Sequence, residues 1–196
     1  MTYPNFFDTL ETIRLYDPLS EALGAFDNGM ICFSYKDIVQ NAGHSCPTIA
    51  GAYLMVREGL KAIYDETMPQ RGNIAVFFRH AQAEGTTGVV ANVFSQITGA
   101  TSDWGFKGIG GAYARVDRLF FNAPITLDVK MQRLDTKRSI EVAYDPSLFL
   151  NDPELSSLLF RIGTLSKEEK YRFQHLWQKR VRKILENFDK VIRIKS

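Results

Sequence analysis

The chain has 196 residues, of which 45% are hydrophobic, and a formal net charge of +2. A chain of this size can bury a substantial core, and it has no apolar run of the roughly 18–20 residues that a membrane-spanning helix needs. Two cysteines exclude a disulfide framework, and residues 1–8 lack the basic and apolar regions of a secretory signal. We therefore expect a cytoplasmic protein with no membrane segment.

The first half of the chain predicts helices interrupted by short strands. Asp17 and Pro18 are typical of a helix cap and first turn, and Pro47 suits the first turn of a longer helix. Cys32 falls in an apolar strand and is interpreted as a small core residue. The expected helices cover 6–14, 17–26, 47–65 and 87–97, and the expected strands cover 30–35 and 73–79.

The second half predicts strands followed by helices. Three strands are expected over 112–121, 125–134 and 138–144, joined by hairpin turns at 122–124 and 135–137. A short helix should follow Asp152, and a capping box from Ser166 to Glu169 should open a long amphipathic helix. This order predicts an α+β fold with helices packed on a mainly antiparallel sheet. We divide it into a core domain, residues 1–150, and a helical extension, residues 151–196.

The C-terminal helix has a strongly basic exposed face. From Lys167 onward the chain has ten Lys/Arg and four Asp/Glu, so this segment carries +6 and the rest carries −4. A basic face can bind nucleic acid, but no aromatic residues alternate with these charges on a sheet surface. We interpret it as a solvated face of a helix whose apolar stripe packs on the core, and we do not expect a nucleic-acid partner.

The segment His44-Ser45-Cys46-Pro47 is the strongest chemical signal in the chain. It brings one of three histidines and one of two cysteines together directly before a predicted helix. Imidazole and thiolate bind zinc and other transition metals, and a thiolate at a helix start is stabilised by the helix dipole. The alternative to a metal site is a purely structural role, in which Cys46 is buried and His44 is a hydrogen-bonded core residue.

This segment also carries a family resemblance. Gly43-His44-Ser45-Cys46-Pro47 followed by Ala50-Gly51-Ala52-Tyr53 resembles the Gly-His-x-Cys-Pro-Gly signature and small-residue helix of the FmdE-like family, which takes its name from the E chain of formylmethanofuran dehydrogenase. Further on, Asn92–Ile97 and Thr98-Gly99-Ala100-Thr101 are similar to the family's Asp-Ala-Ile-Gln helix and Thr-Gly-Cys-Thr turn. The resemblance covers roughly residues 36–145, which is the core domain only.

Several family residues are replaced in this chain. Thr48 stands at the signature's last glycine, and Ala100 at the cysteine of the second motif. Val89 and Asn92 replace a cysteine and an aspartate, and Ala42 replaces a histidine. The resemblance therefore implies an α+β core, a homodimer, and a pocket for a metal or a small ligand near the two residues that survive, His44 and Cys46.

Further residues are candidates to complete such a site. His80 is the first candidate for a third metal ligand because it follows a predicted strand, and Glu84 in the same loop is a weaker one. Asp103 and Trp104 could line the pocket, whereas His175 is interpreted as structural. A partner chain could supply another ligand.

Two cofactors fit these residues. The first is zinc or another divalent transition metal with an open position for a small molecule, whose identity the sequence does not give. The alternative is haem, bound through the thiolate of the Cys46-Pro47 dipeptide. Catalysis and simple binding or sensing remain open alternatives for either cofactor.

Overall fold

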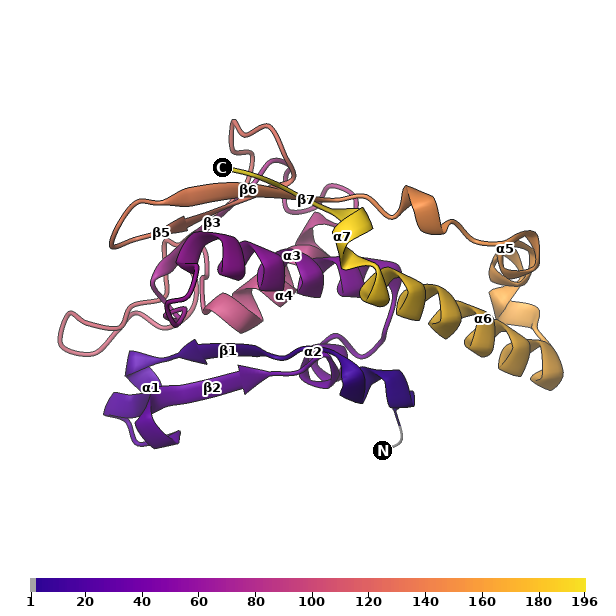
Figure 1. Ribbon diagram of the computed structural model, residues 1–196, viewed down its shortest axis with the longest axis horizontal. Helices are drawn as coiled ribbons and strands as arrows, with labels where there is room; N and C mark the ends of the chain where they lie inside the picture. The colour runs from indigo at the N-terminus through magenta and orange to yellow at the C-terminus, as the bar shows by residue number, and fades with distance from the viewer. Residues whose placement is uncertain (1–2) are drawn as a thin grey trace.

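The computed structural model describes residues 3–196. It has an α+β fold with two sheets (Figure 1). The larger sheet has strand order β4-β3-β5-β6-β7, in which only the β3–β4 pair is parallel. The strands are β1 Ile13–Tyr16, β2 Met30–Phe33, β3 Ile74–Phe78, β4 Leu119–Phe120, β5 Val129–Arg133, β6 Ser139–Tyr144 and β7 Ile192–Lys195. The α-helices are α1 Pro18–Ala22, α2 Tyr35–Ala42, α3 Pro47–Tyr64, α4 Thr87–Thr98, α5 Pro153–Phe160, α6 Lys167–Glu186 and α7 Phe188–Val191, and short 3-10 helices cover Asn5–Thr9, Asp27–Gly29, Ser147–Phe149 and Ile162–Thr164.

Helix α3 is the centre of the fold. It lies with α4 between the larger sheet and the layer formed by α2 and the β1–β2 hairpin (Figure 1). Most of its residues are buried, and two glycines let its neighbours approach closely, because Gly51 lies against the Tyr144 ring and Gly59 against Met131. The close approach at Gly51 is thus made by an aromatic side chain of β6.

The structure confirms the predicted fold class and the helices that begin at Pro47, near Thr87 and after Ser166. The predicted helix over 6–14 is wrong, because a 3-10 helix ends at Thr9 and β1 follows with Ile13 and Leu15 buried. The strand over 30–35 ends at Phe33, where a capping box at Ser34 begins α2, which the prediction missed.

The predicted hairpin at 122–124 is also wrong. Within 112–121 only Leu119–Phe120 forms a strand, and it pairs with β3 in parallel rather than with β5. The hairpin between β5 and β6 at residues 135–137 is confirmed. Cys32 is exposed, not buried, because the neighbouring side chains of Ile31 and Phe33 are the ones that pack against the core.

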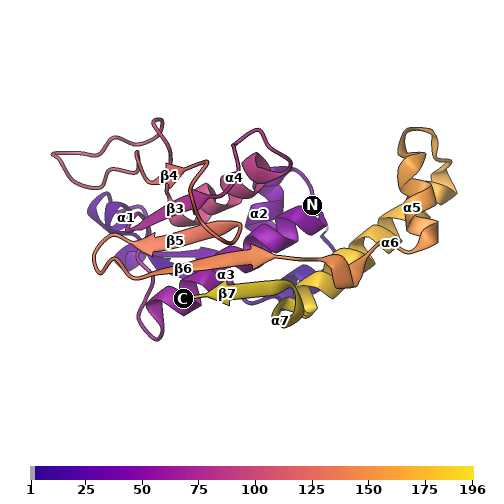
Figure 2. The same ribbon diagram turned by 90° about the horizontal axis from the view of Figure 1, so that it is seen from above.

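The C-terminal segment contributes to the core and also extends beyond it. The second half of α6 buries Val181, Ile184 and Leu185 in the main core, and β7 pairs with β6. The helix ends at Glu186, the short helix α7 follows, and Ile192 begins strand β7. Helix α5 and the start of α6 project from the body of the molecule (Figure 2) and share a small apolar cluster that includes Leu155. No helix within residues 3–196 is long and apolar enough to cross a bilayer.

Candidate functional site

The His-Ser-Cys-Pro loop connects the end of α2 to the start of α3. Cys46 is the residue that caps α3, and its Sγ accepts a hydrogen bond from the backbone N–H of Ile49 at 3.5 Å. Pro47 occupies the first turn, where its missing N–H costs nothing. The thiol of Cys46 is half-buried and has a backbone N–H directed at its sulfur.

Helix α6 holds this loop from the other side. The Trp177 Nε1–H donates to the backbone carbonyl of Ser45 at 2.8 Å. The Ser45 hydroxyl donates to Oε1 of Gln178 at 3.2 Å and lies 3.0 Å from the hydroxyl of Tyr35. Burial raises the pKa of Tyr35, so this phenol remains protonated. Ser45 was missed as a contact residue because its partners on α6 lie more than a hundred residues away.

His44 is exposed, and its imidazole has a defined orientation. Its Nδ1 lies 3.0 Å from the carbonyl oxygen of Ala42, which only accepts hydrogen bonds, so Nδ1 carries the proton. In the neutral ring Nε2 is then an acceptor, and it has no hydrogen-bond partner among residues 3–196. Histidines that bind metals commonly have this arrangement, with one ring nitrogen held by a backbone carbonyl and the other available.

A cavity of about 300 Å³ lies next to this loop, between the first turns of α3 and α4 and the strands β3, β5 and β6. Apolar side chains of Met55, Phe78 and Val90 form part of its wall. Its polar lining comes from Thr48, His80, Glu84, Thr86, Thr87, Asp128 and Tyr144. A mainly apolar wall with a few convergent polar groups is typical of a small-molecule site.

His80 forms the best-defined polar pair in this cavity. Its Nδ1 lies 2.7 Å from Oε1 of Glu84, and both side chains are partly exposed. A carboxylate at Nδ1 holds the proton there and leaves Nε2 as an acceptor, as in a general base or a metal-bound histidine. Asp128 is held in place differently, by accepting the backbone N–H of Tyr144 at 3.1 Å.

Tyr144 is a site residue that the sequence did not indicate. Its hydroxyl is buried and has no hydrogen-bond partner among residues 3–196, and burial raises its pKa. A buried hydroxyl without a partner costs free energy. The alternation of side chains along β6 predicts that Tyr144 lies on the same face of the sheet as Val142 and Ile140. It does not predict that this face borders the cavity.

The residues predicted from sequence fall in two places rather than one. His80 and Glu84 line the cavity, which begins at Thr48, two residues after Cys46; neither His44 nor Cys46 lines it. Across residues 3–196, no three His, Cys, Asp or Glu side chains converge to hold a metal ion. A metal at His44 and Cys46 would therefore need ligands from a partner chain, a bound molecule or water.

The remaining candidates lie away from the cavity. Asp103 and Trp104 are exposed on the loop after α4, and His175 is exposed on α6 rather than packed in the apolar stripe. Cys46 does not line this cavity, so a haem bound through its thiolate would lie outside it.

A comparison with models of protein families found no match, and a comparison with curated proteins found none either.

Proposed function

We propose that this protein binds a small molecule in the cavity between the first turns of α3 and α4. The observation that carries the proposal is the His80–Glu84 pair, which presents an oriented imidazole to a largely apolar cavity of about 300 Å³. Tyr144 also lines the cavity, and its buried hydroxyl has no hydrogen-bond partner among residues 3–196. A ligand with one hydrogen-bond donor and one acceptor next to a compact apolar group matches this lining.

The test combines a binding screen with variants that alter the cavity. Ligand-observed NMR of small fragments should give hits on the full-length protein that are lost in Val90→Phe, which fills the cavity, and weakened in His80→Ala. His175→Ala is the matched control because it removes an exposed histidine on α6. Hits that survive both cavity variants would contradict the proposal.

The state of His80 can be measured directly. Long-range ¹H–¹⁵N correlation spectra of the wild-type protein should show His80 with its proton on Nδ1. Glu84→Gln removes the carboxylate that holds this proton, so the Nε2-protonated tautomer should gain population. An unchanged tautomer in Glu84→Gln would show that Glu84 does not orient the ring.

A second proposal follows the FmdE-like resemblance: His44 and Cys46 bind a divalent transition metal, zinc first, in a homodimer. It is supported by the exposed Nε2 of His44, with Nδ1 held by Ala42, and by the half-buried thiol of Cys46. The missing ligands would come from a second copy of the chain or from a bound small molecule. His80 lies apart from His44 and Cys46 within one chain, so in this proposal it would act as a ligand only from the second copy.

Metal content decides this second proposal. Elemental analysis should show metal in the wild-type protein and its loss in the His44→Ala/Cys46→Ser variant, with sedimentation reporting a dimer. His175→Ala should retain the metal. Equal metal content in the double variant would refute the proposal, and a Soret absorption band in the purified protein would favour haem instead.

A further inference from the structure

A second cavity, of about 260 Å³, lies on the side of the fold where α1 meets the loop before β3 and the loop after α4. We name it the arginine cavity after Arg71, Arg115 and Arg118; its other polar lining comes from Gln70, Asn73 and Tyr113. The lining contains no aspartate or glutamate within the described part of the chain. This cavity is distinct from the one that contains His80.

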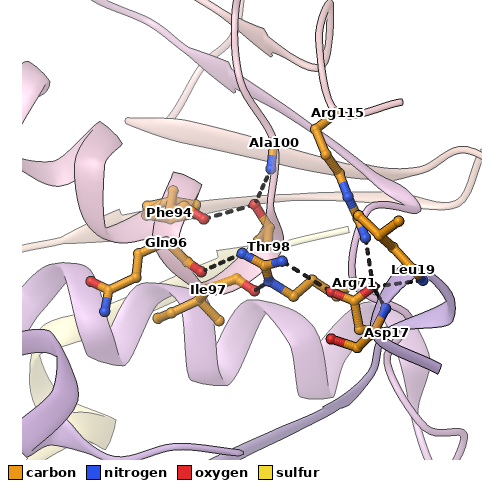
Figure 3. Close-up of polar contacts among 10 residues, drawn as sticks. Asp17, Leu19, Arg71, Phe94, Gln96, Ile97, Thr98, Ala100 and Arg115 are labelled. Atoms are coloured by element: carbon orange, nitrogen blue, oxygen red, sulfur yellow. Dashed lines mark hydrogen bonds and ion pairs between the residues drawn. The ribbon is translucent and has the colours of Figure 1, made fainter. Parts of the chain in front are cut away.

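One carboxylate, Asp17, lies behind the arginines. It is 2% exposed, caps α1, and accepts hydrogen bonds from Arg115 Nη2 at 2.6 Å and Arg71 Nη1 at 3.0 Å. Figure 3 shows both guanidinium groups directed at it. Burial alone raises the pKa of Asp17, but the two arginines more than offset this and leave the pKa below its ordinary value.

Each of the three side-chain nitrogens of Arg71 donates a hydrogen bond in this arrangement. Besides Asp17, its guanidinium donates to the carbonyl oxygens of Gln96 and Ile97 at 3.0 Å each, at the end of α4 (Figure 3). A cation at a helix C-terminus is favourable because the helix dipole is negative there. Arg71 therefore has a structural role, whereas the other two arginines have side-chain nitrogens without a partner among residues 3–196.

Arg115 and Arg118 have donors without acceptors. The side chain of Arg115 is 6% exposed, and its buried Nε has no hydrogen-bond partner among residues 3–196. Arg118 is half-buried, and its guanidinium makes no hydrogen bond or ion pair with any described residue. Burial lowers the pKa of both side chains, and no carboxylate acts on Arg118 against that effect.

The backbone accommodates Arg115 at two glycines. A Cβ at Gly72 would lie 1.3 Å from Arg115 Nη1, and one at Gly99 would lie 3.4 Å from the same atom. Both glycines have positive φ angles, +81° and +76°, which other residues rarely adopt. The guanidinium therefore sits in a space that the missing side chain of Gly72 leaves open.

We propose that the arginine cavity binds the phosphate group of a small ligand through Arg115 and Arg118. Three guanidinium groups line the cavity and Asp17, the carboxylate that pairs with Arg71 and Arg115, balances only one of them, so a net charge of two has no acidic partner among the described residues. A phosphate carries about −1.5 to −2 at neutral pH, which matches these two charges, whereas a carboxylate would neutralise only one. Arginine also binds phosphate oxygens with paired N–H donors.

Calorimetric titration of the full-length protein with inorganic phosphate, at constant ionic strength in chloride buffer, tests this site. The wild-type protein should bind phosphate, and Arg118→Gln should weaken the affinity by about tenfold or more. This variant should keep its stability because Arg118 has no side-chain partner to lose among the described residues. Arg193→Gln, an exposed arginine on β7, removes the same charge elsewhere and should bind phosphate like the wild type.

Two further measurements distinguish specific phosphate binding from general attraction between opposite charges. Phosphate should bind more tightly at pH 7.5 than at pH 5.5, because its second ionisation has a pKa of about 6. Acetate should bind more weakly than phosphate at pH 7.5. Phosphate binding that is absent in the wild type, unchanged in Arg118→Gln, or no tighter than acetate binding would overturn the proposal.

Discussion

The indole N–H of Trp177 donates a hydrogen bond to the backbone carbonyl of Ser45 at 2.8 Å. This contact joins the C-terminal helix α6 to the loop that contains His44 and Cys46. Trp177 also packs against both the main core and the small cluster of the projecting α5–α6 segment. The helix that carries the chain's basic face is therefore part of the wall around the candidate metal-binding loop.

Trp177→Phe should destabilise the protein by about 1 kcal/mol, since one partly buried hydrogen bond is lost while most of the ring's packing is kept. Urea unfolding measures this change. Trp104→Phe is the matched control, because Trp104 is 57% exposed and should tolerate the change without loss. Equal effects of the two substitutions would show that the Ser45 contact contributes nothing specific.

Gly51→Ala should destabilise the protein although alanine favours helix by about 1 kcal/mol over glycine. The new Cβ would lie 2.4 Å from the Tyr144 ring, which is held by β6 and cannot move without disturbing the sheet. Gly59→Ala meets the Met131 side chain at the same distance, but a flexible thioether can move aside. Thermal unfolding should therefore give a clearly lower Tm for Gly51→Ala than for Gly59→Ala, and the reverse order would contradict this packing argument.

Asp17→Asn should cost about 3–5 kcal/mol, because it leaves the buried Arg115 without its carboxylate. The contribution of the Asp17 carboxylate to stability should change with pH in a defined direction. Since the folded-state pKa of Asp17 is below its ordinary value of 3.8, its stabilising effect is fully present above that pH and is lost as the pH falls through the folded-state pKa.

Denaturant unfolding of the wild type and Asp17→Asn at several pH values checks both statements. The difference in the free energy of unfolding should be largest near neutral pH and should shrink in acid. A difference that stays constant down to about pH 2 would mean that the carboxylate charge is not the stabilising feature.

Alkylation of the two cysteines should distinguish their environments. Cys32 is exposed and should react first, whereas Cys46 is half-buried and its sulfur accepts a hydrogen bond from Ile49. If Cys46 binds a metal, a chelator should accelerate the labelling of Cys46 alone, as measured by peptide mapping. Cys46 labelling that does not respond to the chelator, in protein shown to contain metal, would exclude the thiolate as a ligand.

Local signals in the sequence determined the main helices. Pro47 and the Ser166–Glu169 capping box mark the starts of α3 and α6, and helical spacing of apolar residues indicated their buried faces. The alternation in β6 and the short connection before it predicted the β5–β6 hairpin. The His-Ser-Cys-Pro loop and His80 were also identifiable from residue type and position before a helix or after a strand.

Only the tertiary structure decided which of these elements meet. The parallel pairing of β4 with β3, and the pairing of β7 with β6, join segments about 40–50 residues apart whose own patterns do not specify a partner. The contact of Trp177 with Ser45 and the grouping of Asp17, Arg71 and Arg115 are equally non-local. Helix capping and hydrophobic periodicity depend on residues close together in the sequence, whereas strand order and clusters of charged side chains depend on how the whole chain packs. For this reason the sequence indicated His44, Cys46 and His80 but not the two cavities.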